Sequence, residues 1–148
     1  MFLPAPLPKP VLCYVTDRRS LPLATSSDAI PLLLRTIESV AAADVDWIQL
    51  REKDLPGGEN LELARSALQA VRARSSQTRI IINDRVDVAL AAGVGGVHLS
   101  ENGFSVPDAR RLCDRFAKDA GKPLEGMANL GSDPIARLRS AGASRSRN

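Results

Sequence analysis

Polar and charged side chains gather where short apolar runs of the chain end. Gln49, Arg51 and Lys53 alternate through the end of the run WIQL, residues 47–50. Because side chains of an extended segment alternate, these three are expected to point the same way. Arginine grips phosphate oxygens through paired hydrogen bonds, and lysine adds a compact point charge. The pattern predicts an anion site. The alternative is a solvated loop with an Arg–Glu or a Lys–Asp pair.

A second polar pair follows the apolar run RIII, residues 79–82, where Asn83 and Asp84 come directly after three isoleucines. A carboxylate close to phosphate-binding cations is a usual way to hold Mg²⁺, which prefers oxygen ligands and keeps several waters. Asp84 is therefore a candidate metal ligand. The alternative is that Asn83 or Asp84 caps a short helix beginning at Val86.

His98, the chain's one histidine, lies in a third such position, within the run GVHL at residues 96–99. A single histidine is more often structural than catalytic, so we do not assign it as a general base. Its position at the end of an apolar run favours a role in shaping the site.

The elements that must carry these residues alternate between strand and helix. Short apolar runs predict strands at 11–16, 47–50, 79–82 and 96–99. Helical spacing predicts helices at 28–43, 59–75, 86–92 and 107–120. Strands that alternate with helices form a parallel sheet, and three consecutive isoleucines require burial on both faces. No dinucleotide-type glycine motif follows the first strand, so the pattern favours the N-terminal half of a (β/α)₈ TIM barrel, whose sites lie at the carboxyl ends of the strands.

The sequence divides into a proline-rich segment at 1–10, the β/α region at 11–120 and a basic Ser/Arg-rich tail at 121–148. The tail contains one possible short helix at 133–140 and no clear fifth strand, and we expect it to be poorly ordered. It carries five basic and two acidic residues, which account for the net charge of +3. A neutral body and 3% aromatic residues argue against a nucleic-acid partner.

Cellular location is predicted from the cysteines and from the hydropathy of the chain. Cys13 and Cys113 lie in apolar runs and are expected to be buried thiols of a reducing compartment. The N-terminal residues do not form a signal peptide, and no apolar stretch approaches the ~20 residues of a membrane span. We therefore expect a cytoplasmic protein without membrane contacts.

Four segments together resemble the thiamine phosphate synthase/TenI family: YVTDR at 14–18, QLREKDL at 49–55, IINDRVDVALAAGVGGVHL at 81–99 and PDARRL at 107–112. Their order and spacing fit from residue 11 to residue 112. The resemblance implies a barrel enzyme of thiamine biosynthesis that couples hydroxymethylpyrimidine diphosphate with thiazole phosphate and releases thiamine phosphate and diphosphate. Departure of the diphosphate first would need stabilisation of a leaving group more than a general base. It also implies phosphorylated small molecules as partners and Mg²⁺ as cofactor.

By the same resemblance, Gln49, Arg51, Lys53 and Asn83 would bind the pyrimidine diphosphate, and Asp84 would bind Mg²⁺. Synthases of the family usually have a second metal-binding aspartate at the position of Gly103, in a segment like HLGQED; here the segment is HLSENG. Glu101 or Asn102 could take its place. The HLSENG form is closer to TenI-like proteins, some of which are thiazole tautomerases.

After residue 112 the resemblance stops, and we interpret the chain as a truncated member of the family. By itself it is expected to have little or no synthase activity, and an inactive fragment that binds a phosphate ligand is a further alternative. An incomplete barrel leaves strand edges exposed, so self-association through these edges is also expected.

Overall fold

The computed structural model describes residues 10–22, 27–120 and 128–129 of the 148-residue chain. Strands and helices alternate along it, as the sequence predicts, with one short 3₁₀ helix after the first strand. In chain order the elements are β1 (Cys13–Val15), η1 (Arg18–Ser20), α1 (Ala29–Ala42), β2 (Trp47–Leu50), α2 (Gly57–Ala73), β3 (Arg79–Asn83), α3 (Val86–Ala92), β4 (Gly96–His98), α4 (Val106–Ala120) and β5 (Ala128–Asn129).

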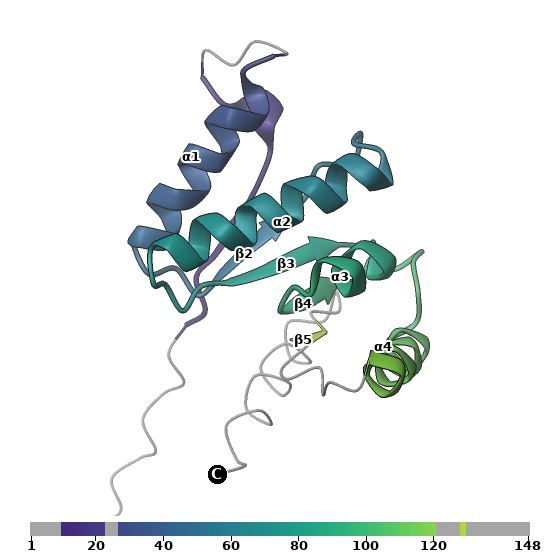
Figure 1. The fold of residues 1–148 in the computed structure, drawn as a ribbon. Helices are drawn as coiled ribbons and strands as arrows, with labels where there is room; N and C mark the ends of the chain where they lie inside the picture. Colours follow the sequence, from purple (N-terminus) through teal and green to yellow (C-terminus); the bar gives the residue numbers. More distant parts are fainter. Residues whose placement is uncertain (1–9, 23–26, 121–127, 130–148) are drawn as a thin grey trace, which may run out of the picture.

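The strands form one parallel sheet in the order β1-β2-β3-β4-β5, so neighbours in sequence are neighbours in space. Figure 1 shows α1 and α2 lying next to each other on one side of this sheet, with α3 beyond α2. This consecutive arrangement of β/α units is that of part of a parallel β/α barrel. Because the strands are parallel, the carboxyl ends of β2, β3 and β4 lie side by side at one end of the sheet.

Alternation along the strands separates two apolar clusters. Ile48, Ile80 and Ile82 are buried in the main core, together with apolar side chains of α1, α2 and α3. Trp47 and Ile81 form a second cluster. Ile80, Ile81 and Ile82 are each at most 3% exposed, which confirms the predicted burial of this strand on both faces. Alternation along β3 therefore sends Ile80 and Ile82 to one face of the sheet and Ile81 to the other.

The predicted ends of the elements hold to within about two residues, and the differences have local causes. The third strand extends to Asn83, because this residue still pairs with His98 on β4. The third helix stops as predicted at Gly93, whose φ of 69° lies in the left-handed region that favours glycine. Across the described ranges, none of the helices has the length and apolar character of a membrane span.

Three sequence-based expectations are wrong. The first strand is an edge strand rather than a buried one: Val11, Leu12 and Val15 are 40–62% exposed. Neither cysteine is fully buried, since Cys13 is exposed and Cys113 is half-buried. A fifth strand exists, at residues 128–129, where two residues pair with β4.

The first two errors have a common source, because an apolar run does not indicate whether both of its faces will be covered. The predicted tail at 121–148, apart from residues 128–129, and the possible helix at 133–140 lie outside the described residues.

Candidate functional site

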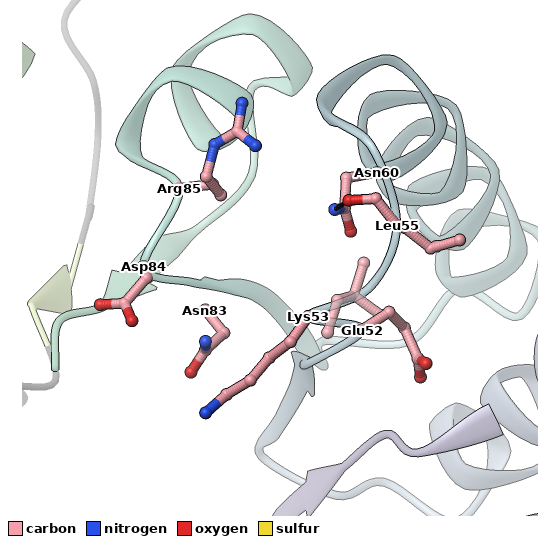
Figure 2. A pocket seen from close by; sticks show the side chains of 8 residues that line it. Glu52, Lys53, Leu55, Asn60, Asn83, Asp84 and Arg85 are labelled. Carbon is pink, nitrogen blue, oxygen red and sulfur yellow. Dashed lines mark hydrogen bonds between the residues drawn. The ribbon is translucent and has the colours of Figure 1, made fainter. Parts of the chain in front are cut away.

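A cavity of about 260 Å³ opens between the segment after β2 and the segment after β3. Both segments follow carboxyl ends of parallel strands, where active sites of β/α barrels lie. Figure 2 shows the side chains that line it. They are Leu50, Glu52, Lys53, Leu55, Asn60, Asn83, Asp84 and Arg85.

Three residues singled out from the sequence, Lys53, Asn83 and Asp84, line this cavity. Lys53 extends toward Asn83 across the gap between the two segments (Figure 2). Gln49 is 7% exposed and joins the group through a hydrogen bond from its Nε2 to Asn83 Oδ1 at 3.0 Å. The structure therefore brings together four of the predicted residues from two neighbouring strands.

Asp84 is held in an unusual conformation at the end of β3. Its φ of 59° lies in the left-handed region, which costs little for aspartate but is uncommon outside glycine. Its backbone N–H donates to the carbonyl of His98 at 2.7 Å, and its carboxylate Oδ1 accepts from the N–H of Ser100 at 2.6 Å. Both bonds come from the end of β4, so the neighbouring strand fixes this carboxylate.

The alternative assignment of Asn83 and Asp84 as helix caps is wrong. The residue that precedes α3 is Arg85, and no side chain caps this helix. Asp84 instead binds the backbone beyond β4, and Asn83 binds Gln49. The polar pair after the isoleucines is thus arranged around the cavity and not around the helix end.

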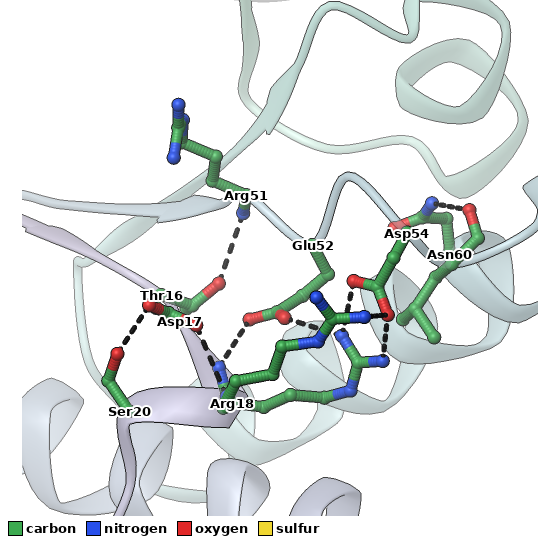
Figure 3. A network of polar contacts seen from close by, with 10 residues as sticks. Thr16, Asp17, Arg18, Ser20, Arg51, Glu52, Asp54 and Asn60 are labelled. Carbon is green, nitrogen blue, oxygen red and sulfur yellow. Dashed lines mark hydrogen bonds and ion pairs between the residues drawn. The ribbon is translucent and has the colours of Figure 1, made fainter.

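A network of ion pairs joins the segment after β1 to the segment after β2 (Figure 3). The carboxylate of Glu52 is 2% exposed and accepts two bonds from Arg18, one from its backbone N–H at 3.0 Å and one from Nη1 at 2.8 Å. Arg18 Nη1 also donates to Asp54 Oδ1 at 2.8 Å, and Nη2 donates to Asp54 Oδ2. One guanidinium therefore bridges two carboxylates, and this bridge satisfies the buried charge of Glu52.

Arg19 adds a second cation to the same network, because its Nη2 donates to Asp54 Oδ2 at 2.9 Å. The hydrogen bond from Arg18, with the charges of both arginines, lowers the pKa of Asp54 below its ordinary value. The same bond to Asp54 raises the pKa of Arg18. The ion pairs with the two arginines therefore favour the ionised form of Asp54.

The network rules out the predicted alternative for Arg51 and Lys53. Glu52 and Asp54, their acidic neighbours in sequence, are bound by Arg18 and Arg19 instead. Within the described residues, neither the Arg51 guanidinium nor the Lys53 ammonium forms a side-chain ion pair, and both residues are exposed. In Figure 3 the Arg51 side chain points away from the network. Among the described residues, these two cations at the end of β2 thus have no acidic side-chain partner.

The backbone at Arg51 is fixed by the neighbouring strand. Thr16, only 1% exposed, accepts a hydrogen bond on its Oγ1 from the N–H of Arg51 at 3.0 Å. The N–H of Thr16 in turn donates to the carbonyl of Gln49 at 2.9 Å. Arg51 does not line the cavity, but it follows the end of β2 directly and precedes Lys53 by two residues.

Two further candidates lie outside the cavity lining. His98 is half-buried on β4, and its contribution to the site is its backbone carbonyl, which binds Asp84. Glu101 is exposed in the turn after β4, and among the described contacts none joins its side chain to Asp84. Among the described contacts, the link between His98 and the site is thus the hydrogen bond from Asp84 to its main-chain carbonyl.

Sequence reasoning missed four residues that the structure places in or beside the site: Arg18, Glu52, Asn60 and Arg85. Asn60 Nδ2 donates to the carbonyl of Leu55 at 2.8 Å and so holds the cavity wall. Arg85 pairs with Asp87 at 2.7 Å. The Arg85 guanidinium lies close to Gly57, since a Cβ there would be 2.6 Å from its Nη2.

The residues present can contribute to a Mg²⁺ site but do not enclose one. In the part of the chain that the structure describes, no three His, Cys, Asp or Glu side chains are grouped to hold a metal ion. Mg²⁺ is commonly bound by one or two carboxylates with waters and substrate phosphates, and the oriented carboxylate of Asp84 fits that arrangement. Gly103 lies beside it, since a Cβ there would be 3.0 Å from Asp84 Oδ1.

Comparison with known proteins places this chain in a family. The sequence model of thiamine monophosphate synthase matches residues 13–117. A relative from Geobacter sulfurreducens is 51% identical over 80 residues, 54% of this chain and 37% of the relative. A thiamine-phosphate synthase from Anaeromyxobacter dehalogenans is 39% identical over 103 residues, 63% of this chain and 45% of that protein. One from Chlorobium limicola is 34% identical over 122 residues, 80% of this chain and 52% of that protein. The chain therefore spans between about a third and about half of the lengths of these relatives.

The fold has a matching neighbour among solved structures. A thiamine phosphate pyrophosphorylase from Pyrococcus furiosus superposes with a TM-score of 0.63 over 91% of this chain and 56% of that one, at 21% identity. The superposition supports the partial β/α barrel. With the match over residues 13–117 and the strand-end site described above, the chain belongs to the thiamine monophosphate synthase family.

Proposed function

We propose that this protein acts in thiamine biosynthesis as a thiamine-phosphate synthase, and that its described residues bind the diphosphate of hydroxymethylpyrimidine diphosphate. The observation that supports the proposal is the group Lys53, Asn83 and Asp84 around one cavity. The family match covers all three residues. Arg51 adds a second cation at the same strand end whose acidic neighbours are bound elsewhere.

In the proposed reaction, the bond between the pyrimidine methylene carbon and the diphosphate oxygen breaks, and the diphosphate leaves with the electron pair. The nitrogen of thiazole phosphate then donates its lone pair to the methylene carbon, which gives thiamine phosphate. Negative charge develops on the leaving oxygen, so cations and N–H donors fixed near it lower the barrier. Arg51 and Lys53 would provide the cations, and the amide of Asn83 would donate a hydrogen bond.

Mg²⁺, when bound, would neutralise part of the diphosphate charge. Asp84 would hold it through the carboxylate that Ser100 orients. Because Gly103 provides no side chain at the neighbouring position, the metal in this proposal takes most of its other ligands from diphosphate oxygens and water. Binding of metal and of diphosphate should therefore depend on each other.

The test is a titration of the full chain with inorganic diphosphate, with and without Mg²⁺, followed by an assay of diphosphate release from both substrates. We expect saturable diphosphate binding that requires Mg²⁺ and weakens in Arg51→Ala. Binding that is absent, or that is unchanged in Arg51→Ala, would overturn the proposed site. Release of diphosphate without formation of thiamine phosphate would overturn the proposed activity.

Gly103 favours a second candidate, a TenI-like thiazole tautomerase, because this position lacks the carboxylate expected of a synthase. The two functions separate in one experiment. A tautomerase converts the thiazole phosphate without any pyrimidine diphosphate, whereas a synthase leaves it unchanged until the second substrate is added.

A further inference from the structure

The order of charges at the end of β2 is Arg51, Glu52, Lys53, Asp54, in which each cation has an acidic neighbour. Such an alternation would ordinarily neutralise itself in a surface loop. The structure arranges it differently, because both acids are bound by arginines of the preceding β/α unit. This difference requires an explanation beyond stability, since the cluster lies directly beside the proposed anion site.

We propose that Arg18 is a positioning residue, which keeps Asp54 and Glu52 away from Lys53 and Arg51 so that these two cations remain available to a diphosphate. The inference rests on the proposed function and adds to it a residue of the 3₁₀ helix η1, in the segment after β1. Arg18 does not line the cavity, and its action on the ligand is through the two carboxylates that it binds.

The geometry supports this role for each acid in a different way. Glu52 is buried and is also held by the backbone N–H of Arg18, so its carboxylate stays in place as long as the segment after β1 is docked. Figures 2 and 3 show Glu52 and the neighbouring cations diverging, with Lys53 directed to the cavity side. Glu52 is thus removed from competition mainly by burial.

Asp54 is the acid that Arg18 must restrain. Its side chain is 34% exposed, and in the described contacts its side chain is bound by Arg18 and Arg19. Arg19 is itself 71% exposed and contributes a single hydrogen bond, which is worth little at a surface. Without the fork from Arg18, Asp54 is free to pair with the adjacent Lys53 and so to compete with a bound anion.

The variant Arg18→Gln/Glu52→Gln tests the inference without leaving a buried charge unpaired, because it replaces both ends of the buried ion pair with amides. Its net charge equals that of the native chain. We expect its affinity for inorganic diphosphate with Mg²⁺, measured by isothermal titration calorimetry, to fall by about three- to fivefold, as loss of an ion-pair restraint of this kind implies.

A third substitution identifies the cause of the loss. Addition of Asp54→Asn removes the released acid and should restore the native affinity or exceed it. The matched control adds Glu38→Gln to the same double variant, which makes the same change in net charge on α1, where Glu38 pairs with Arg74. We expect no recovery in the control. Equal recovery in both would show a general charge effect and would overturn the inference.

The conservative variant Arg18→Lys provides a second route. A lysine ammonium at the place of Nη1 can contact Glu52 and Asp54 Oδ1 but cannot reproduce the second bond of the guanidinium, from Nη2 to Asp54 Oδ2. The restraint on Asp54 is then reduced, so diphosphate binding should weaken while the thermal melt stays cooperative. Native affinity in both Arg18→Lys and Arg18→Gln/Glu52→Gln would overturn the role of Arg18 and leave the proposed function standing. Absence of diphosphate binding in the native chain would overturn both.

Discussion

The side-chain amide of Gln49 donates a hydrogen bond to Asn83 Oδ1 at 3.0 Å and thereby joins the carboxyl ends of β2 and β3 at the strand-end cavity. Because Oδ1 is engaged as an acceptor, the amide group of Asn83 is left to offer its two N–H donors to a ligand. The bond orients a neutral donor between Lys53 and Asp84.

Replacing Asn83 by aspartate should abolish this donor and place a carboxylate in the anion site. We expect Asn83→Asp to weaken diphosphate binding by at least about tenfold, since a donor is lost and a repulsion is added. Asn83→Ala, which only removes the donor, should have a smaller effect. Calorimetric titration of the two variants measures the difference, and equal affinities would contradict the assigned orientation of the amide.

Arg51 and Lys53, the two cations without an ion-pair partner in the described part of the chain, should contribute separately to anion binding. We expect Arg51→Ala and Lys53→Ala each to weaken diphosphate binding by about ten- to a hundredfold, the usual range for a hydrogen bond to a charged group. The control is Arg65→Ala, an exposed arginine on α2 that removes the same charge away from the site. Comparable losses in the control would mean that net charge alone drives the binding.

Introducing a carboxylate at position 103 should strengthen metal binding. Gly103→Asp places a second acid beside Asp84, so we expect Mg²⁺ affinity in the presence of diphosphate to rise by about tenfold or more. Gly103→Asn is the neutral control, because it adds a side chain of similar size near Asp84 Oδ1. The measurement is a Mg²⁺ titration at fixed diphosphate, and an equal gain in both variants would exclude the charge as the cause.

Acid should weaken the link between the segments after β1 and β2. Since the pKa of Asp54 is lowered by Arg18, the ionised form is favoured in the folded state. The stability that it contributes is therefore fully present above the ordinary aspartate value of 3.8 and is lost as the pH falls below it. Urea unfolding of the native chain and of Asp54→Asn should give a free-energy difference that is constant from about pH 5 to 7 and shrinks below about pH 4. A difference that grows toward low pH would contradict the pairing.

The exposed edge of the sheet predicts self-association. β1 lies at the edge of the sheet, and two apolar side chains beside this edge are exposed: Leu12, just before β1, at 62% and Val15, its last residue, at 46%. We expect concentration-dependent assembly in sedimentation velocity, and we expect Leu12→Lys to reduce it. Thr36→Lys, on α1, serves as the charge control. Assembly that persists unchanged in Leu12→Lys would exclude this edge.

The elements of this fold are predictable because their signals are local. Three isoleucines in a row at 80–82 can be buried only between two layers, and Gly93 can end a helix in the left-handed conformation. The exposure of β1 was not predictable, because the run VLCYV does not indicate whether a further strand will cover it. Whether a strand is buried depends on the elements that pack beside it and over its two faces.

The candidate site was predictable only in part, for a similar reason. Lys53, Asn83 and Asp84 follow strand ends, so a parallel topology alone brings them together. The sequence suggests only neighbouring residues as partners for Glu52, since nothing in QLREKDL shows that an arginine 34 positions earlier will bind it. Long-range ion pairs of this kind depend on which segments pack against each other in the fold, and the spacing of residues along the chain does not predict this packing.

The unequal length of the strand pairings has a kinetic consequence. β2 and β3 pair along four residues, whereas β1 pairs with β2 along three and forms the sheet edge. Amide hydrogen exchange should therefore be slowest at Ile80–Ile82 and faster around Arg18, because edge strands open without global unfolding. Each opening of β1 would undock Arg18 from Glu52 while the cavity walls stay together. The residence time of a bound anion would then follow the lifetime of the docked edge strand.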